Sequence, residues 1–244
     1  MSDRFLRKAK PSLIVQKLLV KAVLERNLIN NGDRILIATS GGKDSTVLAW
    51  ALSAIRPEIK KTYELAALHI SSDFCSCCKK AMLTKRLDEW GIPFTDLFVP
   101  IIHRLKESRR MNCYWCSTQR RAELLKYATE NQFNKIALGH HLDDIIETFF
   151  MNMTGKGQLS TMPILLRYRD YPVSLIRPLA YLEERELIAC AAEKDILKAA
   201  CTCPYGLKSA RRDIRTRIAS FTDNSGAVKR RILAAIDAGK LLEH

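Results

Sequence analysis

The sequence predicts an α/β protein with a doubly wound, parallel five-stranded sheet and helices on both faces. Apolar, β-branched runs alternate along the chain with segments whose apolar residues recur at helical spacing, which is the pattern of repeated strand–helix units. A glycine pair, Gly41 and Gly42, joins the first of these runs to a helix. Because open α/β sheets bind ligands at the carboxyl ends of their strands, we expect the functional site there.

The expected strands are apolar runs bounded by polar or glycine-containing turns. They cover residues 34–39, 63–70, 94–99, 135–141 and 174–179. Expected helices cover residues 12–27, 77–91, 118–131, 142–153 and 183–194, and a further helix begins at the glycine pair and ends near residue 56. We therefore divide the chain into an N-terminal helical segment (1–32), a central α/β domain (33–200) and a basic helical tail (201–244).

The composition indicates a polyanionic partner. The 244 residues include 40 Lys and Arg against 26 Asp and Glu, a net charge of +14, and such an excess is typical of nucleic-acid-binding proteins. A solvated helix face is the alternative for any single basic cluster. No apolar run approaches the ~20 residues that span a bilayer. The first residues also lack the apolar centre of a signal peptide, so we expect a cytoplasmic protein without membrane contact.

The stretch from Ser40 to Ser45 is expected to bind phosphate. Gly41 and Gly42 allow the backbone to approach a ligand closely, and the first turn of the following helix offers unpaired N–H groups. Lys43 adds a positive charge, and the serines add hydroxyl groups. A βα turn with a serine cap is the simpler alternative.

The eight cysteines indicate metal or redox chemistry, because no signal peptide points to an oxidising compartment. Cys113 and Cys116 have the C-x-x-C spacing, which suits zinc, a redox pair or two buried thiols. A third thiolate from the distant pair Cys201 and Cys203 would suit an iron–sulfur cluster better than a zinc ribbon. A further group could be inert core thiols, metal ligands or a persulfide carrier: Cys75, Cys77 and Cys78.

The string Ser40-Gly-Gly-Lys-Asp-Ser45 resembles the pyrophosphate loop of the PP-loop ATP pyrophosphatases, the adenine nucleotide alpha hydrolase superfamily. It does not fit the Walker loop, which has four residues between its first glycine and Gly-Lys-Ser/Thr. The resemblance implies cleavage of ATP between the α- and β-phosphates, which leaves AMP on a substrate oxygen. It also implies that Lys43 neutralises phosphate and that Asp44 helps to hold Mg²⁺.

Three more strings are similar to the tRNA 2-thiolation enzymes of the TtcA/TtuA family, and the likeness runs from about Val20 to Ile218. The strings are Cys113-Tyr-Trp-Cys116-Ser-Thr-Gln-Arg120-Arg121, Ala137-Leu-Gly139-His140-His141-Leu-Asp143-Asp144 and Ile176-Arg177-Pro178-Leu179-Ala180-Tyr181. The last looks particularly like the TtcA branch, and the terminal zinc modules of TtuA-type enzymes are absent. The family implies a [4Fe-4S] cluster on Cys113, Cys116 and Cys203, with Cys201 as the reserve ligand.

The resemblance also implies roles for individual side chains. Lys43, Asp44 and Asp144 are the expected catalytic residues. The expected ATP-binding residues are Ser40, Gly41, Gly42, Lys43, Asp44, Ser45, His69, Gly139, Asp143 and Asp144. The expected tRNA-binding residues are Arg120, Arg121, Arg211, Arg212 and Arg215.

Simpler interpretations exist for several of these residues. Aspartates at a helix N-terminus favour the helix dipole without any ligand. The histidines at 69, 140 and 141 are expected to be satisfied structural residues. Tyr114 and Trp115 are expected to pack around a cluster rather than stack on bases.

Together the motifs predict an ATP-, Mg²⁺- and [4Fe-4S]-dependent tRNA thiolase that adenylates the C2 oxygen of a pyrimidine and replaces it with sulfur. A cytidine in the anticodon loop is the expected target. The implied partners are tRNA, a sulfur donor (a cysteine desulfurase or sulfide) and, as a candidate assembly, a homodimer. The alternatives are a PP-loop enzyme that activates a carbonyl for nitrogen attack, an RNA-binding module without turnover, and sulfur transfer or removal on a small thio-compound.

Overall fold

The computed structural model describes residues 9–74, 80–105, 110–196 and 210–242. Its six-stranded sheet has the order β3-β2-β1-β4-β6-β5, and β1, β2, β3, β4 and β6 are parallel. The strands are β1 (Asp33–Ala38), β2 (Tyr63–Ser72), β3 (Phe94–Val99), β4 (Lys135–Ala137), β5 (Leu165–Arg167) and β6 (Ser174–Ile176). The predicted α/β class with a doubly wound sheet is therefore confirmed.

The predicted strand number of five was too low by one. The sixth strand, β5, pairs antiparallel with β6 at the edge of the sheet. It has three residues, too few to produce the alternating pattern by which a strand is recognised in a sequence. β4 is also shorter than predicted and ends at Ala137, before the Gly139-His140-His141 string.

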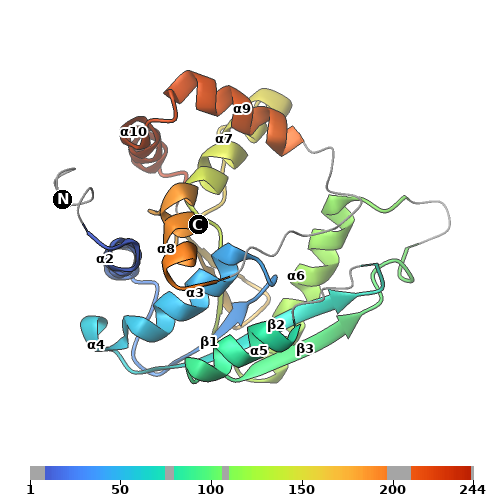
Figure 1. Ribbon diagram of the computed structural model, residues 1–244. Helices are drawn as coiled ribbons and strands as arrows, with labels where there is room; N and C mark the ends of the chain where they lie inside the picture. The colour runs from blue at the N-terminus through green and yellow to red at the C-terminus, as the bar shows by residue number, and fades with distance from the viewer. Residues whose placement is uncertain (1–8, 75–79, 106–109, 197–209, 243–244) are drawn as a thin grey trace.

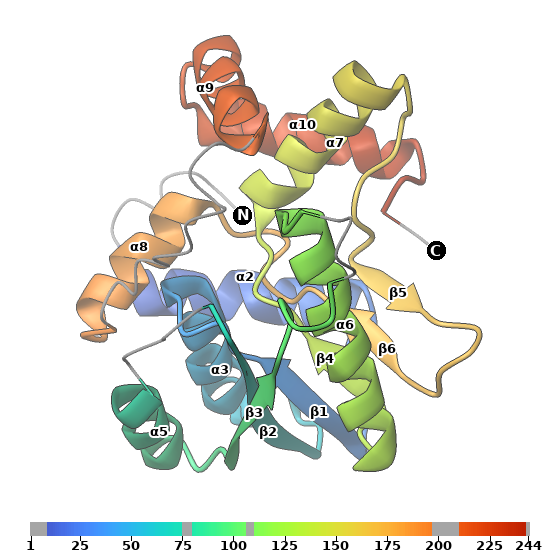
Figure 2. The ribbon, with the colours of Figure 1, turned by 90° about the vertical axis from the view of Figure 1, so that its right-hand side faces the viewer.

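The helices form two layers and a group at one end of the molecule (Figure 1). They are α2 (Pro11–Glu25), α3 (Lys43–Ala54), α4 (Arg56–Ile59), α5 (Lys80–Glu89), α6 (Cys113–Glu130), α7 (Leu142–Lys156), α8 (Glu184–Glu193), α9 (Ala210–Thr222) and α10 (Gly226–Ala238). Figure 2 shows α6 on one face of the sheet and α2 and α3 on the other, with α7, α9 and α10 together beyond the strands. Among the described residues, no helix combines the length and the apolar character that crossing a bilayer requires.

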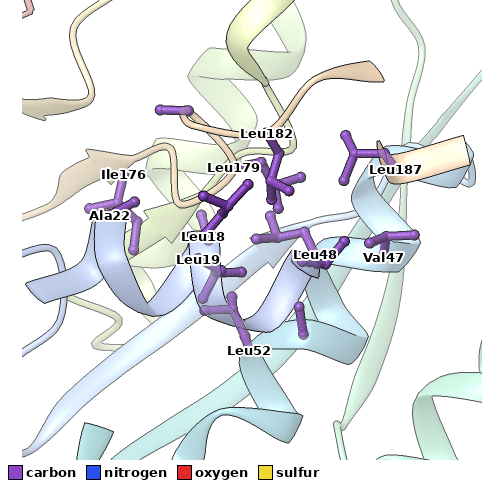
Figure 3. Packing of buried hydrophobic residues seen from close by; sticks show 14 of the residues in the cluster. Leu18, Leu19, Ala22, Val47, Leu48, Leu52, Ile176, Leu179, Leu182 and Leu187 are labelled. Carbon is purple, nitrogen blue, oxygen red and sulfur yellow. The ribbon is translucent and has the colours of Figure 1, made fainter. Parts of the chain in front are cut away.

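Two apolar cores hold these layers together. The larger core lies where α2, α3 and α8 meet the sheet, and Figure 3 shows Leu18, Leu48 and Leu187 from these three helices within it. The smaller core lies under α6, where Leu125 packs among residues of β1, β2, β4 and β6. The larger core also continues beyond the strands, where it includes Ile145 of α7, Ile218 of α9 and Leu233 of α10.

The start of α6 differs from the prediction. The helix begins at Cys113 rather than near Thr118, because the side chain of Asn112 accepts a hydrogen bond from the backbone N–H of Trp115 at 2.8 Å. Asparagine is among the strongest N-cap residues. The whole C-x-x-C string therefore lies in the first turn of a helix and not in the loop before it.

A buried ion pair joins β1 and β4 at the amino ends of these strands. Lys135 Nζ lies 2.7 Å from Asp33 Oδ2, and both side chains are more than nine-tenths buried. The same ammonium donates to the carbonyl oxygen of Leu28. Removing one partner of a buried pair is costly because the other charge stays in a medium of low polarity.

We expect Asp33→Ala to lower the free energy of unfolding by about 3 kcal/mol, since it leaves the Lys135 ammonium buried without its counter-charge. The control is Glu64→Ala, which removes the exposed partner of Arg34 and should cost less than about 1 kcal/mol. Urea denaturation at pH 7 measures both variants. Equal losses would contradict a special role for the buried pair.

Candidate active site

The loop from Ser40 to Gly42 connects β1 to α3 and leaves the start of this helix open. Gly41 has a φ of +75°, a conformation that side chains disfavour. Gly42 is the N-cap of α3, and among the described residues no side chain caps this helix end. The hydroxyl groups of Ser45 and Thr46 donate to the Gly42 carbonyl oxygen at 3.1 and 3.0 Å. These hydrogen bonds connect the loop to the first turn of α3. The N–H groups in the first turn of an α-helix have no partner within the helix and can bind an anion.

Gly139 brings the segment after β4 against this loop. A Cβ atom at Gly139 would lie 3.1 Å from the backbone nitrogen of Ser45 and 3.2 Å from its Cα. No larger residue fits without a shift of the backbone of α3. The structure therefore brings together Ser40, Ser45 and Gly139, three of the residues expected to bind nucleotide.

A cavity of about 380 Å³ opens beside the loop. Its floor is apolar and comes from the carboxyl ends of four strands, and its walls are polar. The floor includes Ala38, Leu68, Ile70, Ile136, Leu138 and Leu175. The walls include Ser40, Asp44 and Ser45 from the loop side, Gly139, His140 and Asp144 from the β4–α7 junction, and Ser117, Arg120 and Arg121 from α6. An apolar slot next to an anion site has the character of a nucleotide pocket.

Arg120 and Arg121 line this cavity opposite the loop, although the sequence suggested contacts to tRNA for both. Arg120 Nε is buried and has no hydrogen-bond partner among the described residues. A buried N–H donor without an acceptor is costly, and a phosphate oxygen would satisfy it. The cavity therefore fits a ligand that carries phosphate, such as ATP.

His140, Asp143 and Asp144 differ in their position relative to the cavity. His140 lines the cavity, and burial, with the nearby Arg177 as the next cause, lowers its pKa to about 4, so the ring is neutral at pH 7. Asp144 also lines the cavity, while Asp143 faces away from it. Asp143 Oδ1 lies 2.6 Å from Lys229 Nζ on α10, and its Oδ2 accepts from the backbone N–H of Glu184 at 2.7 Å. Despite burial, these hydrogen bonds lower the pKa of Asp143.

His69 does not line the cavity. It is buried, and its Nδ1 lies 2.7 Å from the carbonyl oxygen of Thr39. Its neighbours Leu68 and Ile70 do line the cavity, and successive residues of a strand point to opposite faces. The structural interpretation of this histidine fits its surroundings better than nucleotide binding.

Lys43 lies between two carboxylates. Its Nζ is 3.1 Å from Asp44 Oδ1 and 3.0 Å from Glu184 Oε1 on α8. Burial lowers the pKa of Lys43, but the hydrogen bond to Glu184 and the charge of Asp44 outweigh it, so the pKa is raised and the ammonium keeps its charge. Sequence reasoning missed Glu184, because no local pattern links it to a loop 141 residues away.

Two of the α9 arginines that the sequence suggested as phosphate clamps are ion-paired to carboxylates. Arg211 Nη1 lies 3.1 Å from Asp144 Oδ1, and Arg215 Nε lies 2.6 Å from Glu147 Oε1. Arg212 is exposed on the same helix. Arg215 is exposed as well, so of the three Arg212 is the exposed one for which no ion pair is found among the described residues.

Cys113 and Cys116 lie three residues apart on α6, so their sulfur atoms share one side of the helix. Cys113 is exposed and Cys116 half-buried, which suits metal ligands. The predicted third ligand Cys203, the reserve Cys201, and Cys75, Cys77 and Cys78 lie outside the described residues. Within the described ranges no group of three His, Cys, Asp or Glu side chains is arranged to hold a metal ion.

The two aromatic residues between these cysteines differ in environment. Trp115 is half-buried, and its Nε1 donates to the carbonyl oxygen of Ile101 at 3.3 Å, as a packing residue would. Tyr114 is 81% exposed and does not pack as predicted.

Comparison with known proteins agrees with this geometry. The PP-loop domain family matches residues 14–220. The tRNA-cytidine(32) 2-sulfurtransferase of Geobacter metallireducens is 34% identical over 221 residues, which cover 88% of this chain and 86% of the relative. The enzyme of the same name from Coxiella burnetii is 33% identical over 231 residues, 92% of this chain and 90% of the relative.

Two solved structures share the fold. The U34-tRNA thiolase NcsA from Methanococcus maripaludis, solved with its [4Fe-4S] cluster, has a TM-score of 0.77 at 24% identity and covers 94% of this chain and 78% of its own. NMN synthetase from Francisella tularensis has a TM-score of 0.55 at 14% identity, with coverage of 96% and 95%. From its sequence matches, the chain belongs to the PP-loop family and, within it, to the family of the tRNA-cytidine(32) 2-sulfurtransferases.

Proposed function

We propose that this chain is an ATP-dependent tRNA thiolase that adenylates the C2 oxygen of a cytidine in the anticodon loop and replaces that oxygen with sulfur. One observation carries the proposal: the nucleotide loop and the helix that begins with Cys113 and Cys116 line the same cavity. The names of the sequence relatives support tRNA as the substrate and cytidine as the base.

The loop and the arginine wall would bind ATP from opposite sides. The N–H groups at the start of α3 would hold phosphate oxygens, while Lys43 and Arg120 would neutralise charge as the α–β bond breaks. Asp44, at the cavity wall, would help to hold Mg²⁺. The transfer places AMP on the C2 oxygen, which turns a poor leaving group into a good one.

Asp144 is the acidic residue that we assign to the active centre. It lies at the cavity wall, its Oδ2 accepts from the backbone N–H of His141 at 3.1 Å, and its Oδ1 accepts from Arg211. These contacts fix the carboxylate at the junction of β4 and α7. Of the two aspartates predicted to face the nucleotide, we keep Asp144 and assign Asp143 a supporting role.

The cysteines of α6 would hold the [4Fe-4S] cluster together with Cys203. Two accessible thiol groups lie on one side of this helix, one turn from Arg120, and could both bind one iron–sulfur cluster. When bound, the cluster would supply an open iron site for sulfur. Sulfide or a cysteine desulfurase would provide the sulfur in the cytoplasm, and the homodimer stays a prediction of the sequence.

The target base must leave its stack to reach the cavity, as in other enzymes that act on a nucleobase. An unpaired anticodon-loop nucleotide can do so at low cost. Exposed basic side chains such as Arg212 would contact the RNA backbone and position it without reading sequence.

The decisive test is anaerobic purification with quantified iron and sulfide, followed by incubation with tRNA, ATP, Mg²⁺ and sulfide. We expect an iron-containing protein that releases AMP only with tRNA, and 2-thiocytidine in the digested nucleosides by mass spectrometry. Iron-free protein with nitrogen added to a carbonyl would instead indicate a PP-loop ligase. No AMP release at all would indicate an RNA-binding module.

We expect Cys113→Ala to reduce tRNA thiolation at least ~100-fold while ATP binding is retained, because Cys113 is not among the residues that line the cavity with the phosphate loop. Iron content, thiocytidine yield and ATP affinity are the measurements. The control is Cys190→Ala on α8: burial raises the pKa of this thiol to about 12, so it takes no part in thiolate chemistry. Full turnover by Cys113→Ala would refute the cluster role.

We expect Arg120→Ala to weaken ATP binding ~10-fold or more in the absence of RNA, since a charge-assisted hydrogen bond contributes about 1.5–3 kcal/mol. Isothermal titration calorimetry measures the affinity. Lys126→Ala, an exposed cation on the same helix, is the matched control and should bind ATP like the native protein. If Arg120→Ala binds ATP normally but loses tRNA affinity, the arginine is an RNA contact as first predicted.

A further inference from the structure

The side chain of Lys43 is held from α8, outside its own loop. Besides its sequence neighbour Asp44, its Nζ contacts Glu184 Oε1 at 3.0 Å. An ammonium group has three donors, so two carboxylates leave one donor for a phosphate oxygen. The position of Glu184 therefore sets the direction in which this remaining donor points.

Glu184 is in turn fixed at three points. Its backbone N–H donates to Asp143 Oδ2 at 2.7 Å, and its Oε2 lies 3.2 Å from Arg215 Nη1 on α9. Despite partial burial, the hydrogen bond from Lys43 lowers the pKa of Glu184, so the carboxylate stays ionised. A group with both oxygens engaged has little freedom to rotate.

Arg215 bridges two carboxylates from different helices. Its Nε lies 2.6 Å from Oε1 of Glu147 on α7, while its Nη1 contacts Glu184 on α8. Glu147 is 2% exposed, and burial raises its pKa even with Arg215 beside it. Moving Arg215 to an RNA phosphate would leave this carboxylate buried beside Arg211 alone, which is costly.

We propose that Glu184 is a positioning residue for Lys43 and that Arg215 holds Glu184 in place, so that α9 helps to set the nucleotide loop. The inference rests on the proposed function only in taking ATP as the ligand of the loop. Arg215, which the sequence suggested as an RNA contact, then supports the ATP site without contacting ATP itself. A series of ion pairs thereby connects α3, α8, α9 and α7 through Lys43, Glu184, Arg215 and Glu147.

The test measures binding of α,β-methylene-ATP, which resists cleavage at the α–β bond, to the full chain without RNA. We expect Glu184→Gln and Arg215→Ala each to weaken binding about tenfold. Arg217→Ala, an exposed arginine on the same helix, should leave the affinity unchanged. Thermal melting of each variant identifies any that has lost its fold, and Arg215→Lys, which keeps the charge, then serves as the milder variant.

A second measurement separates positioning from general support of the fold. If Glu184 acts through Lys43, Glu184→Gln should have no further effect on affinity in a Lys43→Met background. Additive losses would overturn the proposal. So would normal nucleotide affinity of folded Arg215→Ala with weakened tRNA binding, which would make Arg215 an RNA contact. Failure of the native chain to bind the analogue would instead refute the proposed function.

Discussion

The contact between Gly139 and the first turn of α3 is the constraint on which the site depends. With 3.1 Å between a hypothetical Cβ and Ser45 N, a side chain at residue 139 would require the backbone at the start of α3 to shift. This approach sets where α7 starts and therefore where Asp144 enters the cavity. One close backbone contact thus joins two of the segments that line the cavity.

Charged side chains are distributed unevenly around the contact between Gly139 and α3. On the α6 wall, Arg120 has a buried Nε without a partner among the described residues. On the opposite side, cations and carboxylates from five helices form ion pairs: Lys43, Asp143, Glu147, Glu184, Arg211, Arg215 and Lys229. The first arrangement needs a ligand, because a buried donor without an acceptor costs free energy, and the second stabilises the positions of the helices.

Much of the fold could be predicted from the sequence, because long apolar runs and helical spacing are local signals. β5 and the start of α6 were not predicted. β5 has three residues, too few to show a periodic pattern, and the start of α6 depends on a single N-cap residue, Asn112. The site was harder to predict from the sequence than the fold. Asp143 and Asp144 belong to one motif, yet neighbouring residues on a helix point in directions about 100° apart, so only one meets the cavity. Sequence also reveals which residues are arginines but not which have carboxylate partners.

The neutral imidazole of His140 has a consequence for solution conditions. Its pKa of about 4 means that it releases its proton well below the range in which cells work. His140 therefore adds no positive charge to the wall of the cavity near neutral pH. The affinity of the cavity for a negatively charged ligand should therefore not increase through this histidine when the buffer is changed from mildly basic to mildly acidic.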